Sequence, residues 1–224
     1  MMKRKMAEFI DHTKLGPSVT YEDINKLISE ANEYKFKSVC VDPIYVNYAK
    51  KHVDGVLVCT VVGFPHGTSK TDVKVLETKM AVKDGADEID MVSNQNALKN
   101  REDNYVLNEI RAIKKACGNK VLKVIIETSN LSRAEKIRAC ELAKIGGADF
   151  VKTSTGFHKG GATVEDIALM RKIVGPDMGV KASGGVRTYE DAKKMIIAGA
   201  SRIGSSNGVK ILKGDDCNDS NTSY

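Results

Sequence analysis

The sequence predicts an α/β fold, specifically a single (β/α)8 TIM barrel. Eight short runs rich in β-branched residues alternate with amphipathic helical patterns along the chain. The intervals between these runs are long enough for a strand plus a crossover helix, which parallel strands require. A chain of 224 residues, 42% of them apolar, suits one domain with a substantial core. An open, doubly wound sheet is the structural alternative.

The eight predicted strands are short and mostly apolar, as expected for parallel strands covered on both faces. Each is followed by a polar or glycine-rich turn and then by a helical pattern. In chain order the strands are Phe9–Leu15, Ser38–Asp42, Val56–Val62, Glu88–Val92, Val121–Glu127, Asp149–Thr153, Gly179–Ala182 and Ser201–Gly204.

Three of the intervening segments carry clear helix signals. Arg133–Lys144 begins with a capping-box pattern, and Thr188–Ala198 begins with a similar cap. Asp72–Asp84 gathers four apolar side chains near one face, which we expect to face the core: Val73, Leu76, Met80 and Val82.

A short helix-to-strand connection recurs before three of the predicted strands. Its glycine is suited to closing a helix and its alanine to tight packing, so the chain reuses one turn. The three copies are Gly85-Ala86-Asp87, Gly147-Ala148-Asp149 and Gly199-Ala200-Ser201. This repeat favours the closed barrel.

Composition limits the domain organisation and the cellular setting. Residues 1–213 predict one barrel catalytic domain, and residues 214–224 predict a flexible polar tail. No run approaches the length of a membrane span, and Glu8 and Asp11 interrupt the apolar stretch that a signal peptide needs. We therefore expect a cytoplasmic protein that has no membrane contact.

The cysteines and the charge exclude several further classes. Five isolated cysteines without metal-binding spacing predict reduced thiols, with neither a disulfide framework nor a zinc site. A net charge of +6 fits an anionic ligand. The basic residues are dispersed and there is no Trp, so we expect no nucleic-acid partner.

Two lysines at equivalent positions on consecutive predicted strands are the strongest chemical signal. Lys152 and Lys181 each follow a valine, and strand alternation turns both side chains into the barrel if the valines face the helices. Burial and a neighbouring cation lower the pKa of a lysine, and a neutral amine is the nucleophile that forms a Schiff base with a carbonyl. The alternative is a pair of surface lysines, or ion pairs with Glu127 and Asp90.

Asp90 lies on an otherwise apolar strand, where a lone inward carboxylate needs a partner. With Lys181 as that partner it is suited to proton transfer; a structural salt bridge is the simpler alternative. Asp11 and Cys40 are less specific, because a buried Cys is often core filler and Asp11 is able to cap a turn.

Glycine-rich segments follow the last three predicted strands. In TIM barrels the loops after strands seven and eight commonly bind phosphate through backbone N–H groups. The candidates are Thr155, Gly156, Gly184, Gly185, Gly204, Ser205 and Ser206. The residues thus indicate a Schiff-base enzyme for a small phosphorylated carbonyl compound, with the substrate left open.

These motifs together resemble the 2-deoxyribose-5-phosphate aldolase family, over nearly the whole chain. The two lysine motifs in this order are highly specific, and the other pieces are weak singly. The carriers include Ile10-Asp11-His12-Thr13, Val39-Cys40-Val41, Glu88-Ile89-Asp90-Met91-Val92, Val151-Lys152-Thr153-Ser154-Thr155-Gly156, Val180-Lys181-Ala182-Ser183-Gly184-Gly185 and Arg202-Ile203-Gly204-Ser205-Ser206.

The resemblance implies a class I aldolase that reversibly cleaves 2-deoxy-D-ribose 5-phosphate into D-glyceraldehyde 3-phosphate and acetaldehyde, in deoxynucleoside breakdown. It implies no metal or organic cofactor, and a homodimer or homotetramer. Lys152 matches the Schiff-base lysine, Lys181 the lysine that tunes it, and Asp90 the acid/base carboxylate. Asp11 and Cys40 match pocket-lining positions, and the glycine-rich segments match the phosphate site.

The end of the chain and several loops bear on how closely the sequence follows the family pattern. Tyr224 matches a terminal tyrosine that occurs in some relatives and is proposed to assist proton movement. The departures lie in loops beyond the strands, where they bear on loop packing: Gly16, Ser93, Gln95, Asn96, Ser129 and Asn130.

Two other functions remain open on the sequence. One is a Schiff-base aldolase or transaldolase with another sugar specificity, which a substrate panel would separate. The other is a phosphate-binding barrel without catalysis, which would bind a sugar phosphate tightly and leave it intact.

Overall fold

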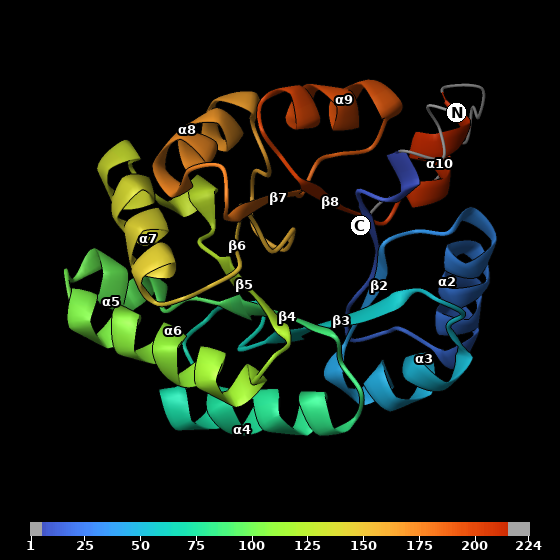
Figure 1. Ribbon diagram of the computed structural model, residues 1–224, viewed down its shortest axis with the longest axis horizontal. Coiled ribbons are helices and arrows are strands. Elements are labelled where there is room, and N and C mark those ends of the chain that lie inside the picture. Colours follow the sequence, from blue (N-terminus) through green and yellow to red (C-terminus); the bar gives the residue numbers. More distant parts are fainter. Residues whose placement is uncertain (1–5, 215–224) are drawn as a thin grey trace.

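The computed structural model describes residues 6–214 and shows a closed barrel of eight parallel strands in chain order. The helices surround the strands on the outside (Figure 1). The strands are β1 Ile10–Lys14, β2 Ser38–Val41, β3 Leu57–Val62, β4 Glu88–Val92, β5 Val121–Ile125, β6 Phe150–Lys152, β7 Gly179–Ser183 and β8 Arg202–Ser205. The predicted TIM barrel is confirmed, and all eight strands lie within about two residues of their predicted bounds.

The helices follow the strands in alternation, with two 3₁₀ turns at Pro43–Tyr45 and Thr128–Asn130. They are α2 Tyr21–Tyr34, α3 Val46–His52, α4 Thr71–Lys83, α5 Gln95–Lys99, α6 Asp103–Cys117, α7 Arg133–Ile145, α8 Val164–Val174, α9 Tyr189–Ile197 and α10 Gly208–Lys213. No helix among residues 6–214 combines the length and apolar character that crossing a membrane would take.

Local signals in the sequence determine where helices begin. Ser132 accepts a hydrogen bond from the Glu135 N–H while the Glu135 carboxylate accepts one from the Ser132 N–H, which completes the predicted capping box of α7. Thr188 and Asp191 form the same box at the start of α9.

The repeated helix-to-strand turn is confirmed in all three copies. Gly85, Gly147 and Gly199 adopt positive φ angles of 106°, 83° and 115°, which glycine tolerates best. In each copy the next residue, an alanine, donates its N–H to a carbonyl five residues earlier, so the helix closes and the following strand starts at once.

Side-chain alternation divides the barrel into two environments. Ile89 and Met91 of β4 point outward into the apolar core between strands and helices, and Val151 and Val180 do the same on β6 and β7. The intervening side chains point into the barrel, as the sequence predicts for the two lysines.

The prediction for the apolar face of α4 is wrong for three of its four residues; the fourth, Val82, is partly buried and packs against the core. Val73, Leu76 and Met80 are exposed, whereas Lys74 and Thr78 are buried. Polar contacts of Lys74 determine this orientation of α4. The Lys74 ammonium lies 2.8 Å from the Glu109 carboxylate of α6 and donates a hydrogen bond to the Val92 carbonyl at 2.9 Å. This buried pair turns the polar side of α4 inward.

The predicted division into a barrel of residues 1–213 and a tail of residues 214–224 stays a prediction. Residues 215–224 lie outside the described residues, so the tail and its Tyr224 are not placed.

Candidate active site

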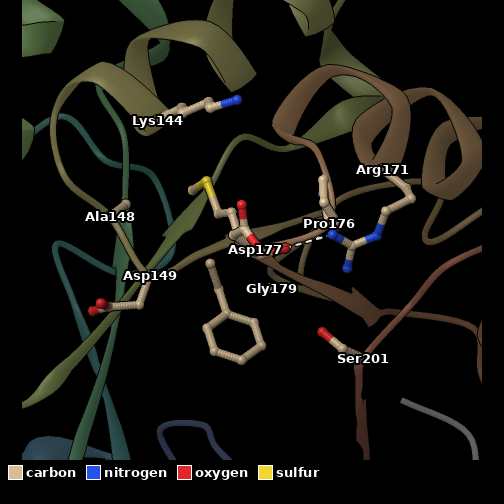
Figure 2. A pocket seen from close by; sticks show the side chains of 10 residues that line it. Lys144, Ala148, Asp149, Arg171, Pro176, Asp177, Gly179 and Ser201 are labelled. Atoms are coloured by element: carbon tan, nitrogen blue, oxygen red, sulfur yellow. Dashed lines mark hydrogen bonds between the residues drawn. The ribbon is translucent and has the colours of Figure 1, made fainter.

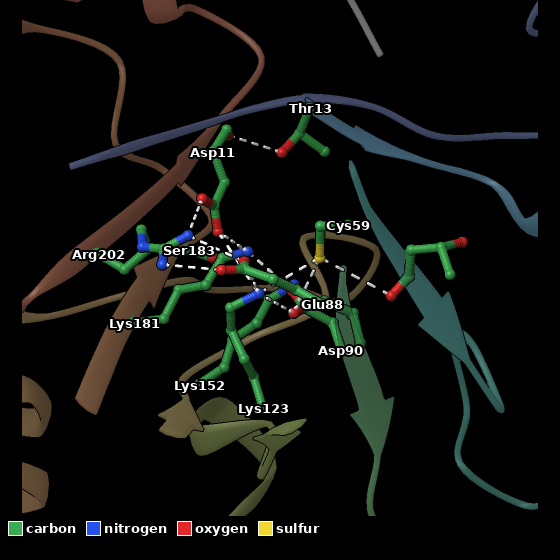
Figure 3. A network of polar contacts seen from close by, with 12 residues as sticks. Asp11, Thr13, Cys59, Glu88, Asp90, Lys123, Lys152, Lys181, Ser183 and Arg202 are labelled. Carbon is green, nitrogen blue, oxygen red and sulfur yellow. Dashed lines mark hydrogen bonds and ion pairs between the residues drawn. The ribbon is translucent and has the colours of Figure 1, made fainter. Parts of the chain in front are cut away.

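The interior of the barrel is ionic. Asp90 of β4 is fully buried and accepts contacts from three lysines (Figure 3). Its Oδ2 lies 2.8 Å from both Lys152 Nζ and Lys181 Nζ, and its Oδ1 lies 2.8 Å from Lys123 Nζ. Lys152 and Lys181 are register partners on β6 and β7, so they converge on one carboxylate oxygen. Their alternative as surface lysines is thereby excluded.

A second layer of charges continues the network toward the start of the strands. The Arg202 guanidinium donates to both oxygens of Glu88 and, at 2.6 Å, to Asp11 Oδ1. Lys123 Nζ lies 2.6 Å from Glu88 Oε2, and Lys181 Nζ lies 2.6 Å from Asp11 Oδ2. Asp11 is thus an ion-pair partner of Lys181 and not a cap for its own turn.

Burial does not lower the pKa of Lys181, contrary to the expectation from the sequence. Desolvation acts in that direction, but Asp11 and Asp90 outweigh it and raise the pKa of Lys181 far above the usual value. Likewise, burial would raise the pKa of Asp90, yet Lys123, Lys152 and Lys181 hold it well below 3.8. The two carboxylates therefore favour the protonated form of Lys181, beside Lys152.

The network holds four basic side chains and three carboxylates. Lys123 contacts three carboxylates, Lys181 and Arg202 contact two each, and Lys152 contacts Asp90 alone. The network therefore carries one positive charge more than its negative charges, and an unbalanced charge in a buried cluster is costly. Lys152 makes the fewest anionic contacts of the four basic side chains.

The buried network predicts a specific pH dependence of stability. Asp11 and Asp90 have lowered pKa values, so their contribution is present above pH 4, where they ionise in the unfolded chain, and is lost on acidification. Lys181 has a raised pKa, so its contribution is present below pH 10.5 and is lost as pH rises further.

We therefore expect the free energy of unfolding, measured by urea titration across pH, to be highest between these limits. The Asp11→Asn variant should show a weaker decline at acid pH, since it removes one of the two carboxylates. A free energy of unfolding that increases below pH 4 would contradict this account.

The glycine-rich loops after β6, β7 and β8 lie together at the carboxyl ends of the strands. Ala162 donates its N–H to the Gly184 carbonyl at 3.0 Å, and Ser205 donates its hydroxyl to the Val186 carbonyl at 2.7 Å. Gly184 and Gly185 have positive φ angles of 81° and 77°, and a Cβ at Gly185 would meet only open space. These loops therefore form one rim above Lys152 and Lys181 with accessible backbone.

Gly204 has a steric role at this rim. A Cβ there would collide with the Ser183 hydroxyl and approach Lys181 Cε to 3.0 Å. The Ser205 hydroxyl is committed to the loop backbone, because it also accepts the Asn207 N–H at 3.0 Å. Ser206 lies at the same turn and is exposed.

Thr155 is held by Glu127 and not by a lysine. Buried Glu127 accepts the Thr155 N–H at 3.0 Å and its hydroxyl at 2.6 Å. The φ angle of Glu127 is 51°, which is unusual for a residue other than glycine. The loop after β6 forms hydrogen bonds with Glu127 in this conformation. Gly156 follows with a positive φ of 85° and open space around it. Glu127 thus orients this part of the rim and does not neutralise Lys152.

Cys40 lies inside the barrel near Cys59, and both are buried free thiols. Together with Asp90 they form a group of ligand atoms within 4.8 Å of one another. A cation fits this group poorly, because both Asp90 oxygens already contact lysines and Lys123 Nζ lies 3.3 Å from Cys59 Sγ.

Several unusual loop residues pack into the structure without disturbing the network. Gln95 donates its side-chain amide to the Ile126 carbonyl at 2.9 Å, and the Ser93 hydroxyl donates to the Ile125 carbonyl at 3.0 Å. These bonds tie the loop after β4 to the end of β5.

Sequence reasoning missed part of the network: Cys59, Glu88, Lys123 and Arg202. The sequence contained a signal for two of these residues. Glu88 lies two residues before Asp90, so strand alternation places both side chains on the same face. Lys123 interrupts an apolar strand, as Lys152 and Lys181 do. Among residues 6–214, the buried hydroxyls of Ser154 and Ser183 have no hydrogen-bond partner, and both lie near the rim.

Two hollows lie at opposite ends of the barrel. One of about 540 Å³ is at the amino ends of β6 and β7, with Lys144, Arg171 and Ser201 on its wall (Figure 2). The Arg171 guanidinium there donates hydrogen bonds to the carbonyls of Gly175, Met178 and Gly199, so its role is to hold the backbone in place.

The second hollow, of about 260 Å³, is at the carboxyl ends of the strands, where TIM barrels carry their active sites. It is lined by Pro65, His66, Thr68, Val92, Gln95, Asn96, Glu127, Asn130 and His158.

Comparison with known proteins agrees with this geometry. Residues 3–214 match the family model described as DeoC/LacD family aldolase. The chain is 58% identical to the deoxyribose-phosphate aldolase of Macrococcus caseolyticus (94% of this chain, 97% of that protein) and 59% identical to that of Bacillus subtilis (94% and 96%).

A solved structure has the same fold and a similar sequence. It is described as a unique tetrameric structure of deoxyribose phosphate aldolase from Aeropyrum pernix, with a TM-score of 0.85, 33% identity, and coverage of 94% of this chain and 91% of that one. The matched family model spans the strands that carry Asp90, Lys152 and Lys181. The chain therefore belongs to the DeoC/LacD family of aldolases.

Proposed function

We propose that this aldolase reversibly cleaves 2-deoxy-D-ribose 5-phosphate into D-glyceraldehyde 3-phosphate and acetaldehyde through a Schiff base on Lys152. The observation that carries the proposal is the convergence of Lys152 and Lys181 on Asp90 Oδ2 at 2.8 Å each. The close similarity to deoxyribose-phosphate aldolases of other organisms supports the substrate.

The chemistry begins with the neutral Lys152 amine. It adds to the C1 aldehyde of the open-chain sugar and loses water to form an iminium ion. A base removes the proton of the C3 hydroxyl, the C2–C3 bond breaks, and its electron pair moves into the iminium to give an enamine. Glyceraldehyde 3-phosphate leaves with C3, C4 and C5. Protonation of the enamine at C2, followed by hydrolysis, releases acetaldehyde and the free amine.

Lys181 and Asp90 have distinct roles in this sequence. Lys181 rests as a cation, because Asp11 and Asp90 raise its pKa against the effect of burial, and its charge stabilises developing negative charge. Asp90 Oδ2 accepts from both lysines, which gives a direct path for a proton between them. Asp11 and Cys40 border this centre, Asp11 by holding Lys181 from the opposite side. We also place Tyr224 among the groups that move protons, as in some relatives.

We assign the phosphate to the rim formed by the loops after β6, β7 and β8. Backbone N–H groups around Gly156, Gly184, Gly185 and Gly204, in the turns that also contain Thr155, Ser205 and Ser206, match the usual TIM-barrel arrangement. Binding the remote phosphate holds the short sugar in register with Lys152. The chemistry requires neither a metal nor an organic cofactor, and the poor cation site at Cys40, Cys59 and Asp90 supports this.

We further propose a homodimer or homotetramer that acts in the cytoplasm without nucleic-acid or membrane partners. The four described cysteines, all buried and unpaired, support a reducing compartment.

A steady-state assay with a panel of sugars tests the proposal. We expect cleavage of 2-deoxyribose 5-phosphate, with kcat/KM at least about 10²-fold lower for 2-deoxyribose, because the phosphate supplies binding energy that orients the sugar. Faster turnover of another sugar phosphate would overturn the substrate assignment. Tight binding of 2-deoxyribose 5-phosphate without turnover would favour a ligand-binding barrel.

A further inference from the structure

The hollow of about 260 Å³ at the carboxyl ends of the strands has a polar wall that the proposed aldol chemistry does not use. Its lining side chains come from the segments that follow β3, β4, β5 and β6, and they include His66, Asn96, Asn130 and His158. Neither Asp90 nor any lysine is among them. The hollow is therefore distinct from the centre where the lysines converge.

Two aromatic pairs join the loops after β3 and β6 beside this hollow. The rings of Phe64 and Phe157 meet edge to face with centroids 5.1 Å apart, and those of His66 and His158 do so at 5.7 Å. Both histidines line the hollow, whereas Phe64 packs against apolar side chains inside the barrel. The two loops thus present different side chains to the hollow and to the barrel interior.

Gln95 on the wall of the hollow holds a buried acceptor that lacks a donor. Its side-chain NH₂ donates to the Ile126 carbonyl at 2.9 Å and to the Ser93 hydroxyl at 3.3 Å, which fixes the orientation of the amide. Within residues 6–214 the amide oxygen Oε1 has no hydrogen-bond partner, although the residue is only 9% exposed. A buried acceptor without a donor is costly, so this position favours a ligand that brings one.

The charges on the wall disfavour an anion and a metal ion. Buried Glu127 contributes a carboxylate, and no Lys or Arg lines the hollow. Both hydrogen bonds from Thr155 end on Glu127 Oε2, which leaves Oε1 able to accept another. In the described part of the chain, three metal-ligating atoms gather within 4.8 Å at Cys40, Cys59 and Asp90, and none of these residues lines the hollow. A neutral ligand that donates hydrogen bonds fits this wall better.

The same wall collects residues in which the chain departs from the family pattern. Three of them, Gln95, Asn96 and Asn130, line the hollow, and a fourth, Ser93, accepts the hydrogen bond that helps to orient Gln95. These departures thus meet at one place in the fold, although they come from two different loops. This grouping indicates a binding property of this chain that is separate from its aldol chemistry.

We propose that this hollow binds a small neutral molecule rich in hydroxyl groups, of the class of free monosaccharides and alditols. A hydroxyl group both donates and accepts, so it suits the acceptors of Gln95 and Glu127 as well as the amides of Asn96 and Asn130. The carbon face of such a molecule packs against Pro65 and the two imidazoles. A volume of about 260 Å³ lies just below the range of pockets for drug-sized ligands, which suits a molecule of this size.

A titration of the full chain with erythritol and with ribitol, followed by ¹H–¹⁵N correlation NMR, tests the site. Alditols have no carbonyl group and form no Schiff base with Lys152, so the result does not depend on the proposed aldol reaction. We expect saturable shifts with a millimolar dissociation constant, largest at the amides of His66, Gln95 and Asn96. The absence of saturable shifts overturns the proposal. Largest shifts around Gly184 overturn it too, because the alditol would then occupy the phosphate rim.

Three variants test which side chains hold the alditol. Gln95→Leu and Asn96→Ala should each weaken ribitol binding about 3–10-fold, the effect of one lost hydrogen bond. Asn100→Ala is the matched control, because Asn100 is an exposed asparagine at the end of the same helix and does not line the hollow. Asn96 is exposed, so Asn96→Ala leaves the fold intact where Gln95→Leu disturbs the loop.

Wild-type affinity in both Gln95→Leu and Asn96→Ala would overturn the assignment of this wall. Tighter binding of inorganic phosphate than of ribitol at these residues would show that the hollow selects an anion, which also contradicts the proposal. Far-UV circular dichroism verifies folding of each variant. Cleavage of 2-deoxyribose 5-phosphate by the same samples reports separately on the proposed function.

Discussion

Replacing Lys152 with alanine is expected to abolish aldol cleavage and leave the barrel folded. No other side chain can form the same Schiff base at that position, so kcat should fall by about 10⁴-fold or more. Stability should hold, because Lys152 contacts a single carboxylate, Asp90, which keeps its contacts with Lys123 and Lys181. Steady-state kinetics and thermal unfolding measure the two effects on one sample.

Two controls make this result specific. Lys152→Arg keeps a positive charge near Asp90 but offers no nucleophilic amine, so it should be equally inactive. Lys26→Ala removes an exposed lysine of α2 and should keep wild-type kinetics. Cleavage by Lys152→Ala at the wild-type rate would show that another group forms the covalent intermediate.

Replacing Lys181 with leucine is expected to impair both rate and stability. Asp11 and Asp90 lose one of the two lysines that they share, the other being Lys123, and breaking a buried ion pair costs about 3–5 kcal/mol. The cation that favours neutral Lys152 also disappears, so kcat at neutral pH should fall about 10²–10⁴-fold. In a plot of kcat against pH, the fall in kcat on the acid side should move to higher pH; this fall is called the acid limb below.

The rate profile separates the electrostatic role of Lys181 from a general loss of stability. Lys74→Leu breaks a different buried ion pair, with Glu109, outside the network around Asp90. It should lower the melting temperature comparably and leave the position of the acid limb unchanged. An unshifted acid limb in Lys181→Leu would show that this lysine does not tune Lys152.

Local sequence signals predicted the fold because the barrel repeats one unit. The turns at Gly85, Gly147 and Gly199 each combine a helix end with the start of a strand, and such signals depend on few neighbours. The strand bounds differ by a residue or two, since they depend on hydrogen bonds to the neighbouring strand.

The orientation of α4 was not predictable in the same way. Its apolar pattern indicates a core-facing stripe, but Lys74 reaches Glu109, which lies 35 residues away in the chain. The gain from that buried pair depends on the packing of α4 against α6, and periodicity within one helix contains no information about it.

The site was predicted in part. Lys152, Lys181 and Asp90 stand out because charged residues are rare in apolar strands. The pKa of Lys181 could not be inferred from burial alone, because its direction depends on Asp11, a residue from the opposite end of the chain. The roles of Glu127 and Arg202 likewise depend on contacts between distant strands and loops.

Borohydride reduction in the presence of 2-deoxyribose 5-phosphate, followed by peptide mass mapping, tests the central claim most directly. Reduction converts a Schiff base into a stable secondary amine, so the modified lysine is identified by its peptide. We predict a single adduct on Lys152, with Lys123 and Lys181 unmodified because both remain protonated in their ion pairs. An adduct on another lysine, or none during demonstrable turnover of the sugar, would contradict the mechanism.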